Sequence, residues 1–397
     1  MHLQKKNLKQ NILLLFLFLV FTGCDQKIIK KQATDNNPIH FDVSSWKKSE
    51  KISDKLIKRI DYIPLETNDS CLISGIGKLL IHDDMLYVLD NQFGKTILIF
   101  NKKGRYINSI GSYGKGRGES LGIDDFIIDK NDEKLFILDR TQRKVLIFKL
   151  KDGTFHSEFY VKFLPHNFIM VSDNTLGFYS KFQGNKQGPD YSIAFLNLED
   201  KSCKWFLEKD EYDTRIGEPF SIFQSKKIYY SSYLKDVVYR ITEDDVFPAI
   251  TFNFGESKFP SDRLKKCNNR SSDLRKLFNE GGWTYGVGDI FENDNFITFK
   301  IKLEGERNNV IYSKRTGSYF YGSNYEGALI FLRMTKFLEV NNNKFIGQID
   351  SNIFKKMKKL VIEQGGNSEF KNQYLETEEI VSAGSNPIVI LIEYNKF

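Results

Sequence analysis

Short apolar runs alternate with turn residues along the chain, and two groups of them in the first half match. The first group contains Leu86–Asp90, Ile97–Phe100 and the turn Lys103-Gly104; the second contains Leu135–Asp139, Val145–Phe148 and the turn Asp152-Gly153. The runs beginning at Leu86 and Leu135 are 49 residues apart, and those beginning at Ile97 and Val145 are 48 apart. A fixed period of this size is typical of propeller blades or of solenoid repeats.

Each group predicts a small antiparallel sheet. The runs are rich in β-branched and aromatic residues and are bounded by turn residues, as strands are. Lys103-Gly104 and Asp152-Gly153 lie where a tight hairpin needs a positive φ. The upstream runs 78–81 and 125–129 supply one more strand to each group. Such a unit is apolar on both faces, so we expect the units to stack on one another and to close into a ring.

The second half contains weaker copies of this pattern and two interruptions. Further strands are predicted at 192–198, 228–230, 237–241, 296–300, 310–312, 337–340, 344–347 and 388–392. Residues 261–280 and 353–364 instead show helical spacing, and the second segment is followed by Gly365-Gly366, which suits a helix C-terminus. We expect both to be short helical insertions between strands.

The first 24 residues predict export. Lys5, Lys6 and Lys9 precede an apolar run, 12–21, that is too short to span a bilayer but suits the core of a signal peptide. The run ends in Phe21-Thr22-Gly23-Cys24, which resembles the lipobox of bacterial lipoproteins. The resemblance implies that residues 1–23 are removed and that Cys24 carries the lipid. The alternative is a cysteine within an ordinary cleaved signal.

The polar segment that follows the signal predicts a flexible tether over residues 24–40, and the β-propeller domain is then 41–397. The chain carries a net charge of +7, and without residues 1–23 the charge is +4. That near balance, without a concentrated basic face, argues against a nucleic-acid-binding protein.

Metal and cofactor motifs are not found in the sequence. Its four cysteines form no CxxC pair, and no two of its histidines have metal-ligand spacing. No HExxH, GxSxG or GxGxxG pattern occurs either. We therefore expect no metal, no cofactor and no catalytic residue that the sequence alone can identify.

Several segments resemble the six-bladed β-propeller lipoproteins of Gram-negative bacteria, which are distantly similar to NHL-repeat propellers. These segments are 62–67, Leu89-Asp90, Ile99-Phe100, the glycine-rich 111–119 and 386–396. The resemblance covers residues 40 to 397 and implies an all-β fold of six four-stranded antiparallel blades. It also implies an outer-membrane anchor that faces the periplasm or the cell surface. That family often has proline where Arg117 stands and an aromatic residue where Ser120 stands.

Two groups of residues are candidate binding positions. The loop 111–118 has four glycines and is accompanied by Lys115, Arg117 and Glu119, so its backbone could approach an acidic ligand closely. Alternatively, its glycines serve only the turns between two blades. Asp90, Asp139 and Arg140 follow corresponding strands and could form a polar ring at one mouth, or they could cap turns by bonding to backbone amides.

Aromatic residues near glycine-containing loops leave a similar choice. Trp205, Trp283, Tyr285 and Tyr325 could stack on sugar rings at a glycan-binding mouth, or they could pack between blades.

Two functions remain open. The first is a lipid-anchored binding platform for a protein, peptide or glycan, and we favour it because no catalytic constellation is visible. The second is a carbohydrate-active lyase or hydrolase, because the active site of a propeller can draw one residue from each of several blades. Acidic and basic side chains that converge at one channel mouth with perturbed pKa values would favour the enzyme. A broad exposed apolar patch would favour binding.

Overall fold

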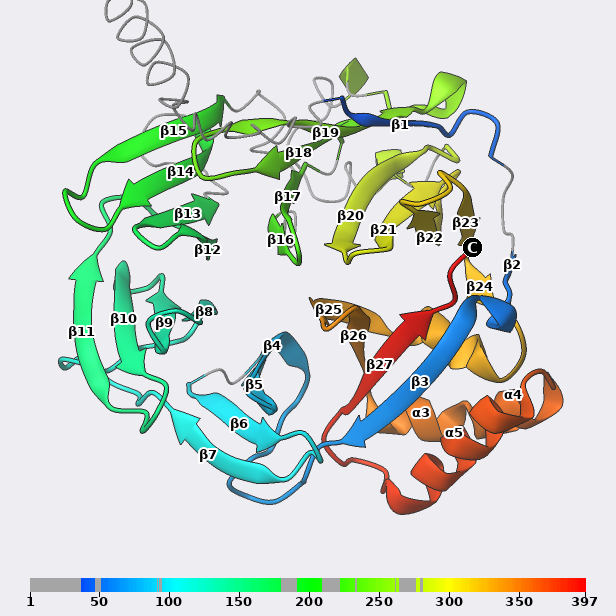
Figure 1. Cartoon of the computed structure of the whole chain (residues 1–397), viewed down its shortest axis with the longest axis horizontal. Helices are drawn as coiled ribbons and strands as arrows, with labels where there is room; N and C mark the ends of the chain where they lie inside the picture. The colour runs from blue at the N-terminus through cyan, green and yellow to red at the C-terminus, as the bar shows by residue number, and fades with distance from the viewer. Residues whose placement is uncertain are drawn as a thin grey trace, which may run out of the picture. The chain divides into compact units, whose positions relative to one another are not determined.

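The computed structural model describes residues 37–46, 51–90, 92, 95–179, 191–208, 222–232, 234–260, 262–263, 276–278 and 281–397. The compact unit Pro38–Phe397 contains six antiparallel sheets arranged around a ring (Figure 1). The first strands of neighbouring sheets contact one another all the way round. The chain therefore forms a six-bladed β-propeller, as the sequence predicts.

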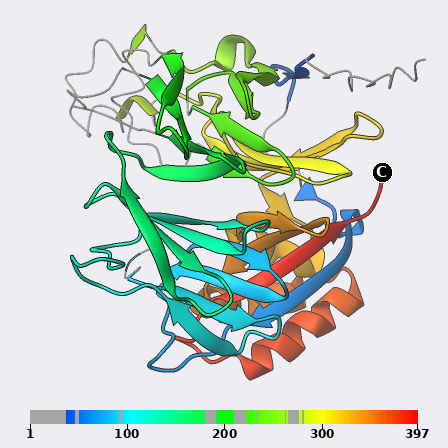
Figure 2. The same cartoon turned by 60° about the vertical axis from the view of Figure 1, so that its left-hand side comes forward.

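Blades I to III follow one another in chain order (Figure 2), and each has its first strand innermost (Figure 1). Blade I contains β4 (Ile76–His82), β5 (Met85–Asp90), β6 (Ile97–Asn101) and β7 (Tyr106–Ile110). Blade II contains β8 (Asp125–Asp129), β9 (Lys134–Asp139), β10 (Lys144–Lys149) and β11 (Phe155–Tyr160). Blade III contains β12 (Asn167–Ser172), β13 (Thr175–Tyr179), β14 (Tyr191–Asn197) and β15 (Cys203–Glu208).

Blades IV and V recruit short strands from elsewhere in the chain. Blade IV contains β16 (Ile222–Gln224), β17 (Ile228–Ser231), β18 (Val237–Ile241) and β19 (Val246–Asn253). Its outer edge is extended by β1 (Ile39–Asp42), which pairs parallel with β19. Blade V contains β20 (Tyr285–Glu292), β21 (Phe296–Leu303), β22 (Glu306–Ser313) and β23 (Tyr319–Gly322). Next to it, β2 (Lys51–Ile52) pairs parallel with β24 (Asn324–Tyr325).

Blade VI closes the ring with strands from both ends of the described chain. It contains β25 (Lys336–Asn341), β26 (Lys344–Ile349), β27 (Ile388–Tyr394) and, outermost, β3 (Ile57–Pro64). The pairing of β3 with β27 runs from Pro64 opposite Ile388 to Ile57 opposite Tyr394. The sequence repeat did not predict this pairing, because it reveals which segments are strands but not which distant strands meet.

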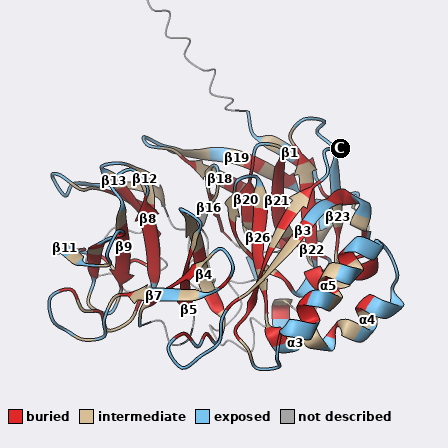
Figure 3. Ribbon diagram, turned by 60° about the horizontal axis from the view of Figure 1, so that its bottom comes forward, coloured by how far each residue is buried: buried red, intermediate tan, exposed pale blue. Residues whose placement is uncertain are grey.

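One apolar cluster fills each boundary between blades. The blade strands accordingly contain long buried stretches (Figure 3). Successive residues of a strand face opposite neighbours, because side chains alternate across a sheet. In β8, for example, Phe126 and Ile128 pack toward blade I, whereas Ile127 packs toward blade III. The expectation that each unit is apolar on both faces is thus met.

Helices occupy the connection between β26 and β27. They are α3 (Ser351–Lys356), α4 (Lys358–Glu363) and α5 (Ser368–Ile380), and they pack beside the 3-10 helix η4 (Gly327–Met334) at the rim of blade VI. The predicted helix 353–364 is present as α3 and α4. The sequence analysis missed α5, whose apolar stripe is thin. The predicted helix 261–280 lies mostly outside the described residues. Among the described residues, no helix is long and apolar enough to cross a membrane.

Asn386 locks the closure of the ring. Its side-chain oxygen accepts a hydrogen bond from the Ile73 amide at 2.8 Å, and its side-chain nitrogen donates to the carbonyls of Glu66 and Cys71 at 2.6 and 2.7 Å. Only 2% of the residue is exposed. It therefore ties the loop before β27 to the segment that leads from β3 into blade I.

We predict that Asn386→Ala lowers the free energy of unfolding by about 2 to 4 kcal/mol, because it leaves several buried backbone groups without partners. Urea unfolding followed by tryptophan fluorescence measures the change. The matched control is Asn174→Ala, which removes an exposed hydrogen bond to Glu199 and should change stability by less than about 0.5 kcal/mol. Equal effects of the two substitutions would contradict this role for Asn386.

Candidate functional site

A cavity of about 410 Å³ lies in the central channel. Described residues of blades I, II, III, V and VI line it, and most of its wall comes from the beginnings of first strands. We call it the channel cavity, and the face of the ring where first strands begin the entry face. Its polar wall residues include Lys78, Asp90, Gln92, Asp124, Asp125, Thr141, Asn167, Asp289 and Lys336.

Asp125 joins three blades on one side of the channel cavity, through an ion pair and a hydrogen bond. Lys78 Nζ of β4 lies 2.8 Å from Asp125 Oδ1 of β8. The other carboxylate oxygen of Asp125 accepts a hydrogen bond from the Phe168 amide of β12 at 2.9 Å. Asp125 is buried, so the low local dielectric strengthens both contacts. These partners hold Asp125 in place while leaving it in the cavity wall.

Asp124 is the exposed carboxylate of this side. Its Oδ2 accepts a hydrogen bond from the Arg140 amide at 2.9 Å. The protein surrounding the carboxyl raises its pKa, the hydrogen bond and charge of Arg140 act against this, and the nearby charges of Asp139 and Asp125 add to it. The pKa of Asp124 is therefore above its usual range, which shows that the positive charge around it does not balance the cost of ionisation.

The opposite side of the channel cavity carries lysines and a strained aspartate. Asp289 of β20 has a φ of 49°, beside two irregularities in the pairing of β20 with β21. Its carboxylate lies 3.0 Å from Lys300 Nζ. Burial lowers the pKa of Lys336, the charge of Asp289 opposes that change, and the charge of Lys300 reinforces it. A positive φ at a residue with a side chain costs energy, and at Asp289 it accompanies the local break in the β20–β21 ladder.

Asn167, the first residue of β12, is the buried polar residue of the wall that lacks a partner. It is 6% exposed, and its Oδ1 finds no hydrogen-bond partner among the described residues. Leaving a buried carbonyl unpaired costs about 1 to 3 kcal/mol. Such orphan groups are rare in folded proteins, and this one belongs to a residue of the cavity wall.

The structure places Asp90 and Asp139 in matching structural positions. Asp90 lines the edge of the channel cavity, and its carboxylate accepts hydrogen bonds from the amides of Ser74 and Gln92. Asp139 is fully buried and accepts from the amides of Leu121 and Gln142. Each residue ends the second strand of its blade and fastens the loop that leads into the first strand. This geometry is that of the turn-capping alternative.

Arg140 lies behind the cavity wall rather than in it. Its backbone amide bonds to Asp124, and its Nε is buried without a partner among the described residues. The residue is therefore next to the site without being one of the residues that line it.

The glycine-rich loop 111–119 packs against the outer part of blade II. Glu119 folds back and accepts a hydrogen bond from the Gly116 amide at 2.8 Å. A Cβ at Gly114 would lie 2.0 Å from the Glu119 carboxylate, so a side chain there would displace this carboxylate from its bond to the Gly116 amide. Lys115 is exposed, and the Arg117 guanidinium lies 5.6 Å from the centre of the Phe155 ring. Lys115, Arg117 and Glu119 are not among the residues that line the channel cavity.

The aromatic candidates that the structure describes pack inside the protein. Tyr285 and Tyr325 are each 1% exposed, and Trp205 packs edge-on against Phe163. Trp283 lies near Phe259 and under the Arg263 guanidinium. None of the four lines the channel cavity.

The sequence analysis did not select Lys78, Asp124, Asn167, Asp289 or Lys336. Their common feature is a position at or near the inner strand of a blade, and it could have been used for blades I and II, where the repeat fixes the strands. In blades III, V and VI the repeat is too degraded to align individual positions.

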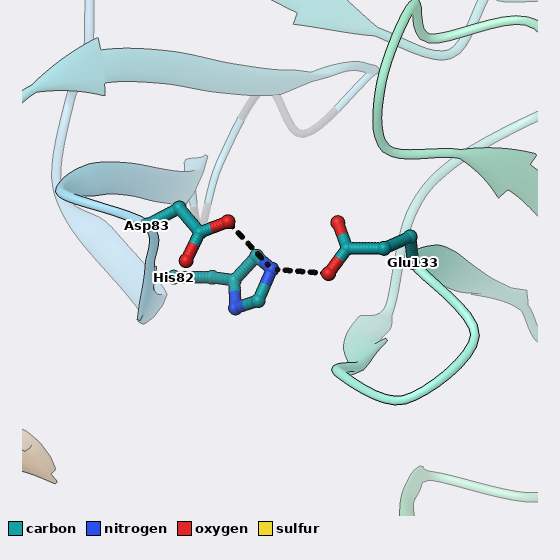
Figure 4. A group of neighbouring side chains, drawn as sticks. All are labelled: His82, Asp83 and Glu133. Atoms are coloured by element: carbon teal, nitrogen blue, oxygen red, sulfur yellow. Dashed lines mark hydrogen bonds and ion pairs between the residues drawn. The ribbon is translucent and has the colours of Figure 1, made fainter.

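A second polar group lies on the face opposite the entry face. His82 Nε2 is 3.0 Å from Glu133 Oε1 and 3.5 Å from Asp83 Oδ2 (Figure 4). Among the described residues, this is the one group of three side chains close enough to share a metal ion. One imidazole and two carboxylates are ligands that Zn²⁺ accepts. However, the carboxylates are 53% and 82% exposed, and contacts with the imidazole account for their positions.

The His82–Glu133 contact is part of a series of links between neighbouring blades on that face. The others are Asn131–Asp173, Lys226–Asp294, Asn343–Asp294 and Asn341 with the Ile81 carbonyl. These contacts join blades I–II, II–III, IV–V, V–VI and VI–I. The face opposite the entry face thus serves to hold the ring together.

Comparisons with known proteins place this fold in a family. The family model described as "Domain of unknown function (DUF4934)" matches residues 38–393. The chain belongs to this family. A comparison of the DUF4934 chain with curated proteins found no match.

Solved structures share the fold of this DUF4934 chain. A Bacteroides fragilis protein that is described as exported is 18% identical, and the match covers 91% of this chain and all of that one with a TM-score of 0.72. A member of the DUF4221 family from Bacteroides vulgatus is 10% identical, and the match covers 85% of this chain and 97% of that one with a TM-score of 0.50. At these identities the similarity shows the fold alone.

Glu339, on the inner strand β25, gives stability a pH dependence. Its carboxylate accepts a hydrogen bond from the Ile81 amide at 2.8 Å. Burial raises its pKa to about 8, although the charges of Lys130 and Lys78 and the hydrogen bond act against that change. The Glu339 carboxyl of the folded protein therefore stays protonated up to about pH 8, whereas in the unfolded chain it loses its proton near pH 4.5.

The stabilising effect of this proton is complete below pH 4.5 and is lost as the pH rises through about 8. We predict that the free energy of unfolding of Glu339→Gln, whose side chain resembles the protonated carboxyl, does not fall over this pH range. Its advantage over the original protein should therefore grow by at least about 1.4 kcal/mol as the pH rises from 4.5 to 8, since one pKa unit corresponds to that free energy. Urea unfolding at a series of pH values measures the difference. A difference that does not change with pH would contradict the raised pKa of Glu339.

Proposed function

We propose that this chain is a lipid-anchored protein of the cell envelope whose propeller binds a ligand in the channel cavity. The observation that carries the proposal is a cavity whose wall combines paired charges, the solvent-exposed carboxylate of Asp124, and Asn167, whose Oδ1 has no partner among the described residues. Its volume lies within the range of small-molecule sites, and it could equally take the end of a peptide or glycan.

The construction of the wall supports binding. Five blades contribute to it, so its polar groups are fixed by the packing of the ring rather than by one flexible loop. Phe168, Phe291 and Phe337 supply apolar surroundings, which exclude water and strengthen polar contacts to a ligand.

Gly122 offers a way to close the channel cavity without disturbing the fold. It lines the cavity, and a Cβ built on it meets nothing within 4 Å. We predict that Gly122→Trp abolishes ligand binding while keeping the unfolding temperature within a few degrees of the original. Gly122→Ala, which adds one methyl group, should retain binding.

The measurement is a thermal-shift screen of the mature protein against oligosaccharides, peptides and small metabolites. A ligand at a hundred times its Kd stabilises by about 2.7 kcal/mol. Shifts that persist in Gly122→Trp would place binding elsewhere. A screen without any shift would leave a protein partner, to be captured from envelope extracts, as the ligand.

Anchoring rests on Cys24 and on the exported Bacteroides relative. We predict that Cys24→Ala abolishes labelling with a fatty-acid analogue and moves the protein from the membrane fraction to the soluble fraction, because an acyl chain contributes about 0.8 kcal/mol per buried methylene. Cys203→Ala, which changes an exposed cysteine of the propeller, is the control and should alter neither property. Unchanged labelling in Cys24→Ala would refute the anchor.

One observation favours an enzyme as a second candidate. A carboxyl with a raised pKa, Asp124, and a lysine with a lowered pKa, Lys336, line the same cavity from different blades. A raised carboxyl pKa and a lowered ammonium pKa bring the two groups closer in proton affinity, which suits a proton donor and acceptor. If oligosaccharide ligands from the screen are cleaved, and Asp124→Asn and Lys336→Met each reduce the rate without weakening binding, the carbohydrate-active alternative is correct.

A further inference from the structure

Three side chains on the face opposite the entry face bring blades I and II together. His82 is the last residue of β4, Asp83 follows it in the turn to β5, and Glu133 lies in the turn between β8 and β9. Both carboxylates converge on one imidazole nitrogen, since Nε2 lies 3.0 Å from Glu133 Oε1 and 3.5 Å from Asp83 Oδ2 (Figure 4). The His82 side chain is only 11% exposed, so its packing fixes the position of this nitrogen.

A hydrogen bond from the imidazole satisfies only one of the two carboxylates. Nε2 carries at most one hydrogen, and Glu133 lies at the distance of a good acceptor. The Asp83 carboxylate accepts no hydrogen bond within the part of the chain that the structure describes, and its contact with His82 is an ion-pair contact. A cation between the three side chains would instead contact both carboxylates and the nitrogen together.

The distances between the three ligand atoms suit a zinc ion. Ligands of a tetrahedral Zn²⁺, with bonds of about 2.0 to 2.2 Å, lie about 3.3 to 3.6 Å apart. The distances from Nε2 are within a few tenths of an ångström of this range, and all three atoms lie within 4.8 Å of one another. Because the carboxylates are exposed, rotation of their side chains can bring the two oxygens to the same separation.

The charges of the group also favour a divalent cation. Beside a neutral imidazole the two carboxylates carry two negative charges, and these add to the effect of burial in raising the pKa of Tyr87. Lysines of the adjoining turns have other partners: Lys102 pairs with Asp84, Lys134 pairs with Asp132, and the charge of Lys130 acts on Glu339. A Zn²⁺ ion would cancel both negative charges.

We infer that His82, Asp83 and Glu133 form a zinc site that clamps blade I to blade II, with water in the fourth position. Mg²⁺ and Ca²⁺ prefer oxygen ligands throughout, whereas an imidazole with two carboxylates is a ligand set of Zn²⁺. The site lies on the face where other contacts also link neighbouring blades. It is separate from the channel cavity and does not depend on the proposed function.

The inference is tested on the mature protein without an affinity tag, after removal of metals with a chelator. Isothermal titration calorimetry with ZnCl₂ should show one site per chain, and MgCl₂ and CaCl₂ should bind at least about a hundredfold more weakly. Zinc should also raise the unfolding temperature by a few degrees, because it binds the folded ring. Gly122→Trp should leave zinc binding unchanged, since it alters the channel cavity alone.

Variants of the three ligands locate the site. Glu133→Gln and Asp83→Asn change exposed side chains and keep their size, so each should fold normally and weaken zinc at least about tenfold. His82→Gln should abolish binding. The controls are His156→Ala and Cys203→Ala, which remove other exposed side chains that can bind zinc and should leave its affinity unchanged.

The outcomes decide between a metal site and a simple contact between blades. Absence of zinc binding would overturn the inference and leave His82 and Glu133 as a hydrogen-bonded pair. Zinc binding that survives Glu133→Gln and Asp83→Asn, or that is lost in either control, would place the metal elsewhere. An equal rise of the unfolding temperature in Glu133→Gln and in the original protein would overturn the clamp. Ligand hits that Gly122→Trp removes would support the proposed function in every one of these cases.

Discussion

The pairing of β3 with β27 is the constraint on which the propeller depends. A blade is apolar on both faces, so an open array would leave two such faces in water, and closure removes both. The two strands are more than 300 residues apart in the chain, and the loop-closure entropy of joining them is repaid by a continuous ladder from Pro64 and Ile388 to Ile57 and Tyr394. Asn386 then fixes the chain where it leaves this ladder for blade I.

Closure creates a second requirement at the centre, because the inner edge of each first strand has unpaired backbone groups. Side chains from neighbouring blades satisfy several of them. Gln348 bonds to both the amide and the carbonyl of Ile76, Glu339 accepts from the Ile81 amide, and Asp125 accepts from the Phe168 amide. The polar groups of the channel thus have a structural origin.

The same reasoning explains why Asp90 and Asp139 attracted attention in the sequence. They recur at one position of the repeat because both blades need the same loop fastened to the same strand, and repetition alone does not distinguish a shared structural task from a shared ligand. Glu119 and the glycines around it are similar, since the Glu119 carboxylate accepts a hydrogen bond from the Gly116 amide within the same loop. Side chains used in this way have little capacity left for binding.

The sequence by itself determined the strands and hairpins of blades I and II, a part of the strands of the later blades, and the expectation that the units stack and close, because these depend on local alternation of apolar residues and on turn chemistry within one unit. It also determined the helix at 353–364, whose apolar residues are periodic. Only the tertiary structure decided that β3 completes blade VI, that β1 extends blade IV, and that Lys78, Asp124, Asn167, Asp289 and Lys336 surround one cavity. The physical reason is that these residues belong to different blades, and their distances are set by closure of the ring, which no local pattern records.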